Sequence, residues 1–147
     1  MAENLHQIYL QTQYEIFALR TLLTIGQQNE VVNGFLRRHR AEQFAFLTAW
    51  NPQSRLLDDA ENRARNLLLA AELVSWPYLL GTTRGPHPAW PGEESFFVID
   101  IPLHRALEIA NQYDQNAIVF GRIDCPADLV FANEAARLRC QPSNPER

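Results

Sequence analysis

Residues 44–55 read Phe-Ala-Phe-Leu-Thr-Ala-Trp-Asn-Pro-Gln-Ser-Arg, an apolar run that ends abruptly in a polar turn. Apolar side chains occupy both alternating sets of positions in 44–49, which is typical of a strand buried on both faces. The turn then brings Asn51, Ser54 and Arg55 close to a predicted helix start. Because α/β folds usually place their chemistry where a buried strand leads into a helix, we expect any functional site at this end of the strand.

Three main helices are predicted around this strand. One follows Asn29, which has the character of a helix cap, and the others cover 59–75 and 103–113. Asp58 and Glu61 have the spacing of a capping box at the start of the second helix. Its predicted core stripe consists of Ala60, Ala64, Leu67, Leu68 and Ala71, and Asn62 and Asn66 share a face beside that stripe.

Further strands are predicted from short apolar runs. Residues 14–25 form one long or two short strands, 78–82, 96–101 and 117–120 form one each, and 124–131 adds an edge strand. A loop over 83–94 carries glycines, prolines, His87 and Trp90. The predicted fold is α/β or α+β, a single mixed sheet of five to seven strands with about three main helices.

Length and composition limit the function classes. The chain has 147 residues, which suits one domain over 1–135, and the polar 136–147 segment is expected to be a flexible tail. A net charge of −4 disfavours broad nucleic-acid binding. No secretory signal or membrane-length apolar run occurs, so we expect a cytoplasmic protein without membrane contact. Cys125 and Cys140 are interpreted as reduced thiols, with a disulfide as the alternative.

The sequence lacks the motifs of several common kinds of functional site. No G-x-S-x-G surrounds Ser54 or Ser95, and the four histidines have no metal-ligand spacing. The six glycines form neither a dinucleotide-binding nor a phosphate-binding loop. No metal and no cofactor is therefore predicted.

An amide-rich set of polar residues remains. It consists of Thr48, Asn51, Ser54, Arg55, Asn62, Asn66, Glu94, Ser95, Gln115 and Asn116. Burying such groups is costly unless each one finds a hydrogen-bond partner. They either brace the turn after Trp50 as a structural network, or they line a pocket that binds a small polar ligand.

Topology brings these residues together if two helices act as crossovers. Strands 44–49 and 78–82 would then run parallel with 96–101 antiparallel to them, and Gln115 and Asn116 would reach the same edge. We expect Asn51, Asn62, Asn66, Glu94 and Asn116 to form one cluster. Glu94, desolvated beside Trp90 and Phe96, would be its hub and candidate general base, while Arg55 or Arg84 would hold an anionic group.

Four pieces of the sequence together resemble the bacterial domain of unknown function DUF3293. They are Thr48-Ala49-Trp50-Asn51-Pro52-x-Ser54, Asn62-x-x-x-Asn66, Trp90-x-x-Glu93-Glu94-Ser95 and Gln115-Asn116-Ala117-Ile118-Val119. The resemblance covers roughly residues 14–132 and implies a small cytoplasmic α/β-type domain, without a settled activity. Tyr113 and Asp114 stand where the family usually has Phe-Gly, which affects only the local turn.

Two functions follow from this reading. The leading hypothesis is a domain, possibly enzymatic, that binds a small polar or nucleotide-like ligand at one sheet edge through the amide-rich set. The alternative is a non-catalytic interaction or regulatory domain in which the Asn/Glu cluster is structural. Its contact surface would then be the arginine-rich helix or the 83–93 loop, and its protein partner is unknown.

Overall fold

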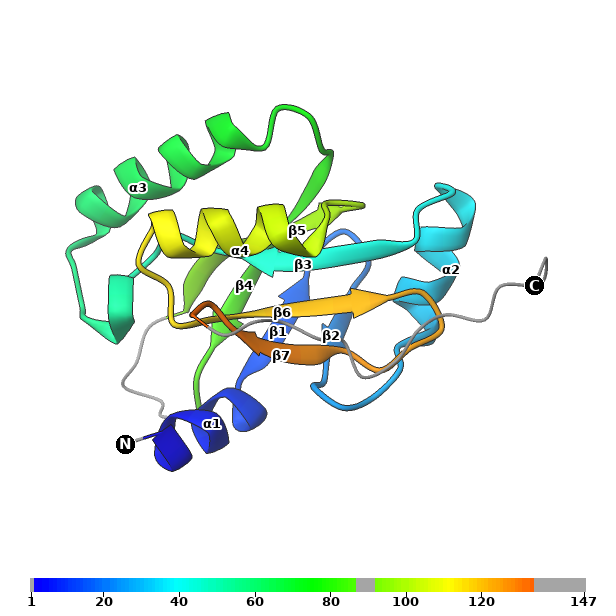
Figure 1. Cartoon of the computed structure of the whole chain (residues 1–147), viewed down its shortest axis with the longest axis horizontal. Helices are drawn as coiled ribbons and strands as arrows, with labels where there is room; N and C mark the ends of the chain where they lie inside the picture. The colour runs from blue at the N-terminus through cyan, green and yellow to red at the C-terminus, as the bar shows by residue number, and fades with distance from the viewer. Residues whose placement is uncertain (1, 87–91, 134–147) are drawn as a thin grey trace.

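The computed structural model describes residues 2–86 and 92–133, which form four α-helices, a short 3-10 helix and seven strands (Figure 1). The helices are α1 (Ala2–Gln11), α2 (Glu30–Arg38), α3 (Asp59–Glu72) and α4 (Leu103–Gln112), with the 3-10 helix η1 at Pro52–Ser54. The strands are β1 (Gln13–Ile16), β2 (Thr21–Leu23), β3 (Gln43–Leu47), β4 (Tyr78–Arg84), β5 (Glu93–Ile99), β6 (Ala117–Arg122) and β7 (Asp128–Phe131). No helix in these ranges is long and apolar enough to cross a membrane.

All seven strands form one sheet in the order β2-β1-β4-β5-β3-β6-β7, and neighbouring strands run antiparallel. Strand β5 lies between β3 and β4, so β3 and β4 point in the same direction, as expected if α3 is a crossover. Helix α4 likewise carries the chain from β5 across β3 to β6. The end of β3 and the starts of β5 and β6 therefore meet at one end of the sheet.

The sheet curls until its two edges touch. Ile25, just after β2, forms a parallel bridge with Ala127, just before β7, and the Gly26 amide donates to the Ala127 carbonyl at 2.8 Å. Close packing on the inner face of this curl requires glycine in two strands. A Cβ on Gly81 would lie 2.2 Å from the Glu15 carbonyl oxygen, and one on Gly121 would lie 2.4 Å from the Phe44 ring.

Two apolar clusters lie on opposite faces of the sheet. On the outer face, Leu47, Val98 and Phe120 pack with residues of α3 and α4, which lie side by side over that face (Figure 1). On the inner face, a second cluster fills the curl beneath α2 and includes Tyr14, Ile16, Phe35, Phe44, Phe46 and Phe97. Strand β3 contributes to both clusters, which confirms the prediction that it is buried on both faces.

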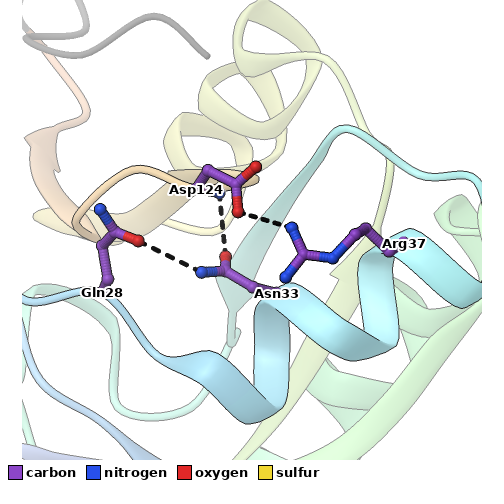
Figure 2. A network of polar contacts seen from close by, with 4 residues as sticks. All are labelled: Gln28, Asn33, Arg37 and Asp124. Atoms are coloured by element: carbon purple, nitrogen blue, oxygen red, sulfur yellow. Dashed lines mark hydrogen bonds and ion pairs between the residues drawn. The ribbon is translucent and has the colours of Figure 1, made fainter. Parts of the chain in front are cut away.

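A polar network fixes the β6–β7 connection to α2 (Figure 2). Asn33, buried in α2, accepts the Asp124 amide at 2.9 Å and donates to Gln28 at 3.3 Å. The Asp124 carboxylate accepts from Arg37 at 2.7 Å. The Asp124 backbone is left-handed, with φ of 63°, so Asn33 holds a turn that few residues other than glycine adopt freely. The exposed ion pair adds little stability because solvent screens it.

The fold class and most elements are confirmed, with a seven-stranded sheet at the upper end of the predicted range. The sheet is antiparallel throughout and not mixed as predicted, because β5 lies between β3 and β4, and β3 lies between β5 and β6. The Asn29 and Asp58 side chains cap α2 and α3 as expected. The 14–25 region is two short strands, and 124–131 does contain an edge strand. Strand β5 begins at Glu93 instead of 96 because pairing with β4 continues to Thr83 and Glu93. The predicted 83–94 loop is correspondingly shorter, and its 87–91 segment and the predicted tail lie outside the described residues.

Two further predictions, on the core face of α3 and on Cys125, are wrong. The predicted core stripe of α3, Ala60, Ala64, Leu67, Leu68 and Ala71, faces solvent, and the buried residues of that helix are Asn62, Asn66 and Leu69. The reason is that backbone partners satisfy both asparagine side chains, so the helix buries a face that contains amides. Cys125 is disulfide-bonded, which contradicts the expectation that it is a reduced thiol.

Candidate functional site

A cavity of about 560 Å³ lies at the end of the sheet where β3 ends and β5 and β6 begin. It opens on the inner face of the curl, between the strands and α1. Ile8, Tyr9 and Thr12 come from α1 and the segment that follows it, whereas Phe46 and Val119 come from the middle of the sheet. Its volume is within the range of ordinary small-molecule sites, roughly 300–1,000 Å³.

The wall of the cavity is mainly apolar and aromatic. It comprises Ile8, Tyr9, Tyr14, Phe46, Pro86, Ala117, Ile118, Val119 and Leu129, with Thr12, Thr48, Thr83 and Gly85 between them. Tyr14 donates its hydroxyl to the Tyr9 carbonyl at 3.1 Å, which ties the first strand to α1. Burial raises the pKa of Tyr14 far above its usual value, with a smaller contribution from Tyr9, so this phenol stays protonated at ordinary pH.

A compact polar cluster closes one end of the cavity. It consists of Asn51, Ser54, Glu93, Gln115 and Asn116. Asn51 donates its side-chain amide to the Glu93 carboxylate at 3.1 Å, and Asn116 donates to the Ser54 hydroxyl at 3.3 Å. Gln115 donates to the Trp50 carbonyl at 3.2 Å. These bonds join the three sheet ends that meet here: the turn after β3, the start of β5 and the start of β6.

The phenol of Tyr9 couples α1 to this cluster. Burial raises the pKa of Tyr9, a hydrogen bond with the Asn116 side chain opposes that shift, and the negative charge of Glu93 adds to it. Tyr9 is therefore a neutral phenol at ordinary pH, able both to donate and to accept a hydrogen bond. The described part of the chain shows no group of three or more His, Cys, Asp or Glu side chains arranged to hold a metal ion.

The turn after β3 is held by Asn62 from α3. Asn51 has a left-handed backbone, with φ of 47°, and its amide donates to the Asn62 side-chain oxygen at 2.8 Å. Asn62 in return donates to the Asn51 side-chain oxygen at 2.8 Å, and that oxygen also accepts the Leu57 amide at 2.9 Å. This reciprocal pair fixes the rotamer of Asn51, which leaves the Asn51 Nδ2 directed at Glu93.

Asn66, one turn further along α3, ties β3 to β5. It accepts the Ala49 amide at 2.8 Å and donates to the Glu94 carbonyl at 2.9 Å. The same carbonyl accepts the Thr48 hydroxyl at 2.6 Å. Arg65 adds bonds to the Ala49 and Tyr113 carbonyls. Asn62 and Asn66 are buried and do not line the cavity, so their geometry is that of a structural brace beneath it.

The residues of the amide-rich set predicted from the sequence therefore have two different places: some line the cavity, and others support it from beneath. Asn51, Ser54, Gln115 and Asn116 line the cavity, whereas Asn62 and Asn66 support it. Ser95 is buried below it, bonded to Thr83 and to the Glu93 carbonyl. Arg55 and Arg84 are exposed and lie outside the cavity lining.

Glu94 does not occupy the expected position as hub. Its side chain is exposed and contributes no lining to the cavity, so the predicted desolvation is wrong. The carboxylate that meets Asn51 belongs to its neighbour Glu93, because alternate residues of a strand point to opposite faces. Phe97, four residues after Glu93, packs in the inner cluster, in line with Glu93 pointing to the inner face. Sequence reasoning also missed Tyr9 and Tyr14, which precede every piece of the amide-rich set.

Comparison with known proteins supports the resemblance and adds no activity. Residues 47–118 match the family model of DUF3293, described as a protein of unknown function, so the resemblance is confirmed over that segment. The segment begins at the last residue of β3 and ends within β6, and it includes both braces and the cluster at the end of the cavity. No curated protein and no solved structure matches the chain.

Proposed function

We propose that this chain, whose central segment matches the DUF3293 family, binds a small amphipathic molecule in the cavity between α1 and the inner face of the sheet. The observation that carries the proposal is the shape of the site: a cavity of about 560 Å³ with an apolar wall and one polar end. Small-molecule sites have this composition, because apolar contact supplies affinity and a few placed polar groups supply orientation. The braced Asn51 supports the idea that the polar end is preorganised.

The charge of the lining narrows the ligand class. Glu93 is acidic, and no lysine, arginine or histidine is among the described residues that line the cavity. A phosphate or carboxylate placed there would lie beside the like charge of the Glu93 carboxylate, which is costly in a partly desolvated site. We therefore favour a ligand with a cationic or neutral hydrogen-bonding end over a nucleotide. The carboxamides of Gln115 and Asn116 can serve a neutral polar group equally well.

A thermal-unfolding screen with three matched compound sets tests this proposal. The sets are small amphipathic amines, neutral alcohols or amides, and carboxylates or phosphates with the same apolar part. A ligand at a hundred times its Kd stabilises by about 2.7 kcal/mol, which raises the Tm of a chain this size by roughly 5–10 °C. We expect stabilisation by the first or second set and none by the third.

Variants then assign the effect to the cavity. Glu93→Gln should weaken binding of an amine, while Glu94→Gln, its exposed neighbour outside the cavity, should leave that binding unchanged. Ala117→Phe places a large ring in the cavity lining and should abolish stabilisation by any ligand. If no compound set stabilises the protein, or if stabilisation survives unchanged in Ala117→Phe, the cavity is not a ligand site.

A further inference from the structure

The Asn116 side chain contacts two hydroxyl groups at the polar end of the cavity. Its Nδ2 donates to the Ser54 hydroxyl at 3.3 Å, and it also forms a hydrogen bond with the Tyr9 phenol. Burial raises the pKa of Tyr9, and this second bond opposes the rise, which is the effect of a donor to the phenol oxygen. Both hydroxyls therefore accept from Asn116, so each must direct its own proton away from that amide.

The protons of the Tyr9 and Ser54 hydroxyls find no acceptor in the described part of the chain. The remaining hydroxyl groups of the cavity lining each donate to a carbonyl or to another hydroxyl, and they belong to Thr12, Tyr14, Thr48 and Thr83. A donor in a partly desolvated site is costly without a partner. The polar end is therefore best completed by a molecule that brings hydrogen-bond acceptors.

The turn after β3 fixes Ser54 in this position. Asn51, Gln53 and Ser54 have left-handed backbones, with φ of 47°, 51° and 61°. Such strain persists in non-glycine residues only where surrounding contacts hold it, and it is concentrated at functional sites. Here the Gln53 amide donates to the Asp114 carbonyl at 2.7 Å, two residues before Asn116. This bond ties the turn to the start of β6 and so holds Ser54 beside Asn116.

Helix α1 brings Tyr9 to the same point. None of its residues 7–11 is buried, so this part of the helix has little packing of its own against the sheet. The Tyr9 ring contacts Phe131 edge-on, with 6.1 Å between the ring centroids, and the Tyr9 carbonyl accepts the Tyr14 hydroxyl at 3.1 Å. Neither contact uses the phenol oxygen. Tyr9→Phe therefore removes the hydroxyl donor and keeps the contacts that anchor the helix.

We propose that the cavity selects a molecule whose polar end is an uncharged carbonyl group, such as a ketone, an ester or an amide, with the Tyr9 and Ser54 hydroxyls as its donors. This inference rests on the proposed function, because it takes the cavity as the ligand site and specifies the polar end of the ligand. A carbonyl oxygen has two lone pairs and can accept from both hydroxyls. Asn116 is a positioning residue, which sets the direction of the two protons.

Charged ligands fit this arrangement less well. An anion is disfavoured by the carboxylate of Glu93, which lines the same end of the cavity. An ammonium group carries donors and no acceptor, so it cannot use the proton of either hydroxyl. An uncharged carbonyl meets both conditions. The apolar wall of the cavity would then contact the hydrocarbon part of the molecule.

Titration calorimetry with two matched compounds tests the proposal on the full chain. The compounds are a methyl ketone and a primary amine built on the same phenylbutyl frame. The ketone should bind at least about tenfold more tightly than the amine, because two neutral hydrogen bonds distinguish them. Their shared frame cancels the contribution of the apolar wall.

Single variants then assign the preference to the two hydroxyls. Tyr9→Phe and Ser54→Ala should each weaken ketone binding roughly three- to tenfold, the range expected for one neutral hydrogen bond, and should leave amine binding unchanged. Tyr78→Phe and Ser75→Ala are the matched controls. They make the same changes at exposed residues outside the cavity lining and should bind the ketone like the parent.

Asn116→Asp tests whether this residue directs the protons. A carboxylate accepts and cannot donate, so both hydroxyls should turn their protons toward it. Ketone binding should weaken at least about tenfold while amine binding strengthens, because the hydroxyl donors are lost and a negative charge is added. A residue with only a structural role would weaken both compounds alike, and that result would overturn the positioning role of Asn116.

The results separate this inference from the proposed function. If neither compound binds the parent, or if both bind Ala117→Phe unchanged, the cavity is not a ligand site and both proposals fail. If both compounds bind in the cavity but the amine binds as tightly as the ketone, the carbonyl preference alone is overturned. The same conclusion follows if Tyr9→Phe and Ser54→Ala bind the ketone like the parent.

Discussion

Replacing Asn62 by alanine tests the brace on which the polar end of the cavity depends. The side chain is only 1% exposed, accepts the Asn51 amide at 2.8 Å and donates to the Asn51 side-chain oxygen at 2.8 Å. Its removal leaves the Asn51 amide buried without a partner, at about 1–3 kcal/mol. The Asn51 side-chain oxygen still accepts a hydrogen bond from the Leu57 amide after the substitution. Losing the second bond, from the Asn62 side chain to this oxygen, therefore costs only the net value of one hydrogen bond, about 0.5–1.5 kcal/mol.

The expected net effect is smaller than the sum of these losses. Alanine is the better helix former, by up to about 0.7 kcal/mol, and this gain offsets part of the cost. We therefore expect Asn62→Ala to lower the free energy of unfolding by roughly 1.5–3.5 kcal/mol. In urea, with a slope of roughly 1–3 kcal/mol per molar, the midpoint should fall by roughly 0.5–3.5 M.

Two controls make this measurement specific. Arg63→Ala changes an exposed neighbour on the same helix and should stay within about 0.5 kcal/mol of the parent. Amide hydrogen exchange should accelerate at Asn51 in Asn62→Ala, while the Ala49 amide, bonded to Asn66, keeps its protection. A midpoint equal to that of the parent, or equal acceleration at both amides, would refute the brace as the origin of the effect.

Two further predictions concern pH and packing. Burial, and then the hydrogen bond to Glu72, raise the pKa of Tyr113 to about 12, above its usual 10.0. The folded state therefore holds the Tyr113 proton more tightly than the unfolded state, and the free energy of unfolding should fall as pH rises from about 10 to 12. Over this pH range the urea midpoints of the parent and of Tyr113→Phe should converge. A constant difference between the two midpoints would contradict the raised pKa. Gly81→Ala should destabilise by at least about 1–3 kcal/mol, because the new Cβ would lie 2.2 Å from the Glu15 carbonyl. Thermal unfolding should show a lower Tm for Gly81→Ala than for the parent. Gly85→Ala is the control and should keep the parent Tm, because its added Cβ meets nothing within 4 Å. Equal Tm values for the two variants would contradict the close approach at Gly81.

Much of the fold was accessible from local patterns. The double apolar alternation of 44–49 predicts the buried strand, and the Asn29 and Asp58 caps mark the starts of two helices correctly. These features depend on neighbouring residues, whose spacing the sequence states directly. The expectation that Asn51 and Asn62 lie together also follows from the chain, because α3 begins only a few residues after the turn.

The exposed stripe of α3 shows where such patterns fail. Counting apolar residues places the core on Leu67 and Leu68, yet the helix buries Asn62 and Asn66. An amide is buried at little cost when backbone groups satisfy it. For Asn66 these are the Ala49 amide just after β3 and the Glu94 carbonyl in β5, 17 and 28 residues away in the sequence. Hydrophobicity alone cannot show which partners a helix will meet.

The chain by itself determined that a polar set would gather at one end of the sheet, and only the tertiary structure decided which members face the cavity. Glu93 and Glu94 are adjacent, so alternation requires that they point to opposite faces but does not say which points inward. The register of β5 between β3 and β4 makes that choice and places Glu93 beside Asn51. Helix α1 closes the cavity only because the curled sheet brings β1 near β6 and β7, a contact between segments more than a hundred residues apart.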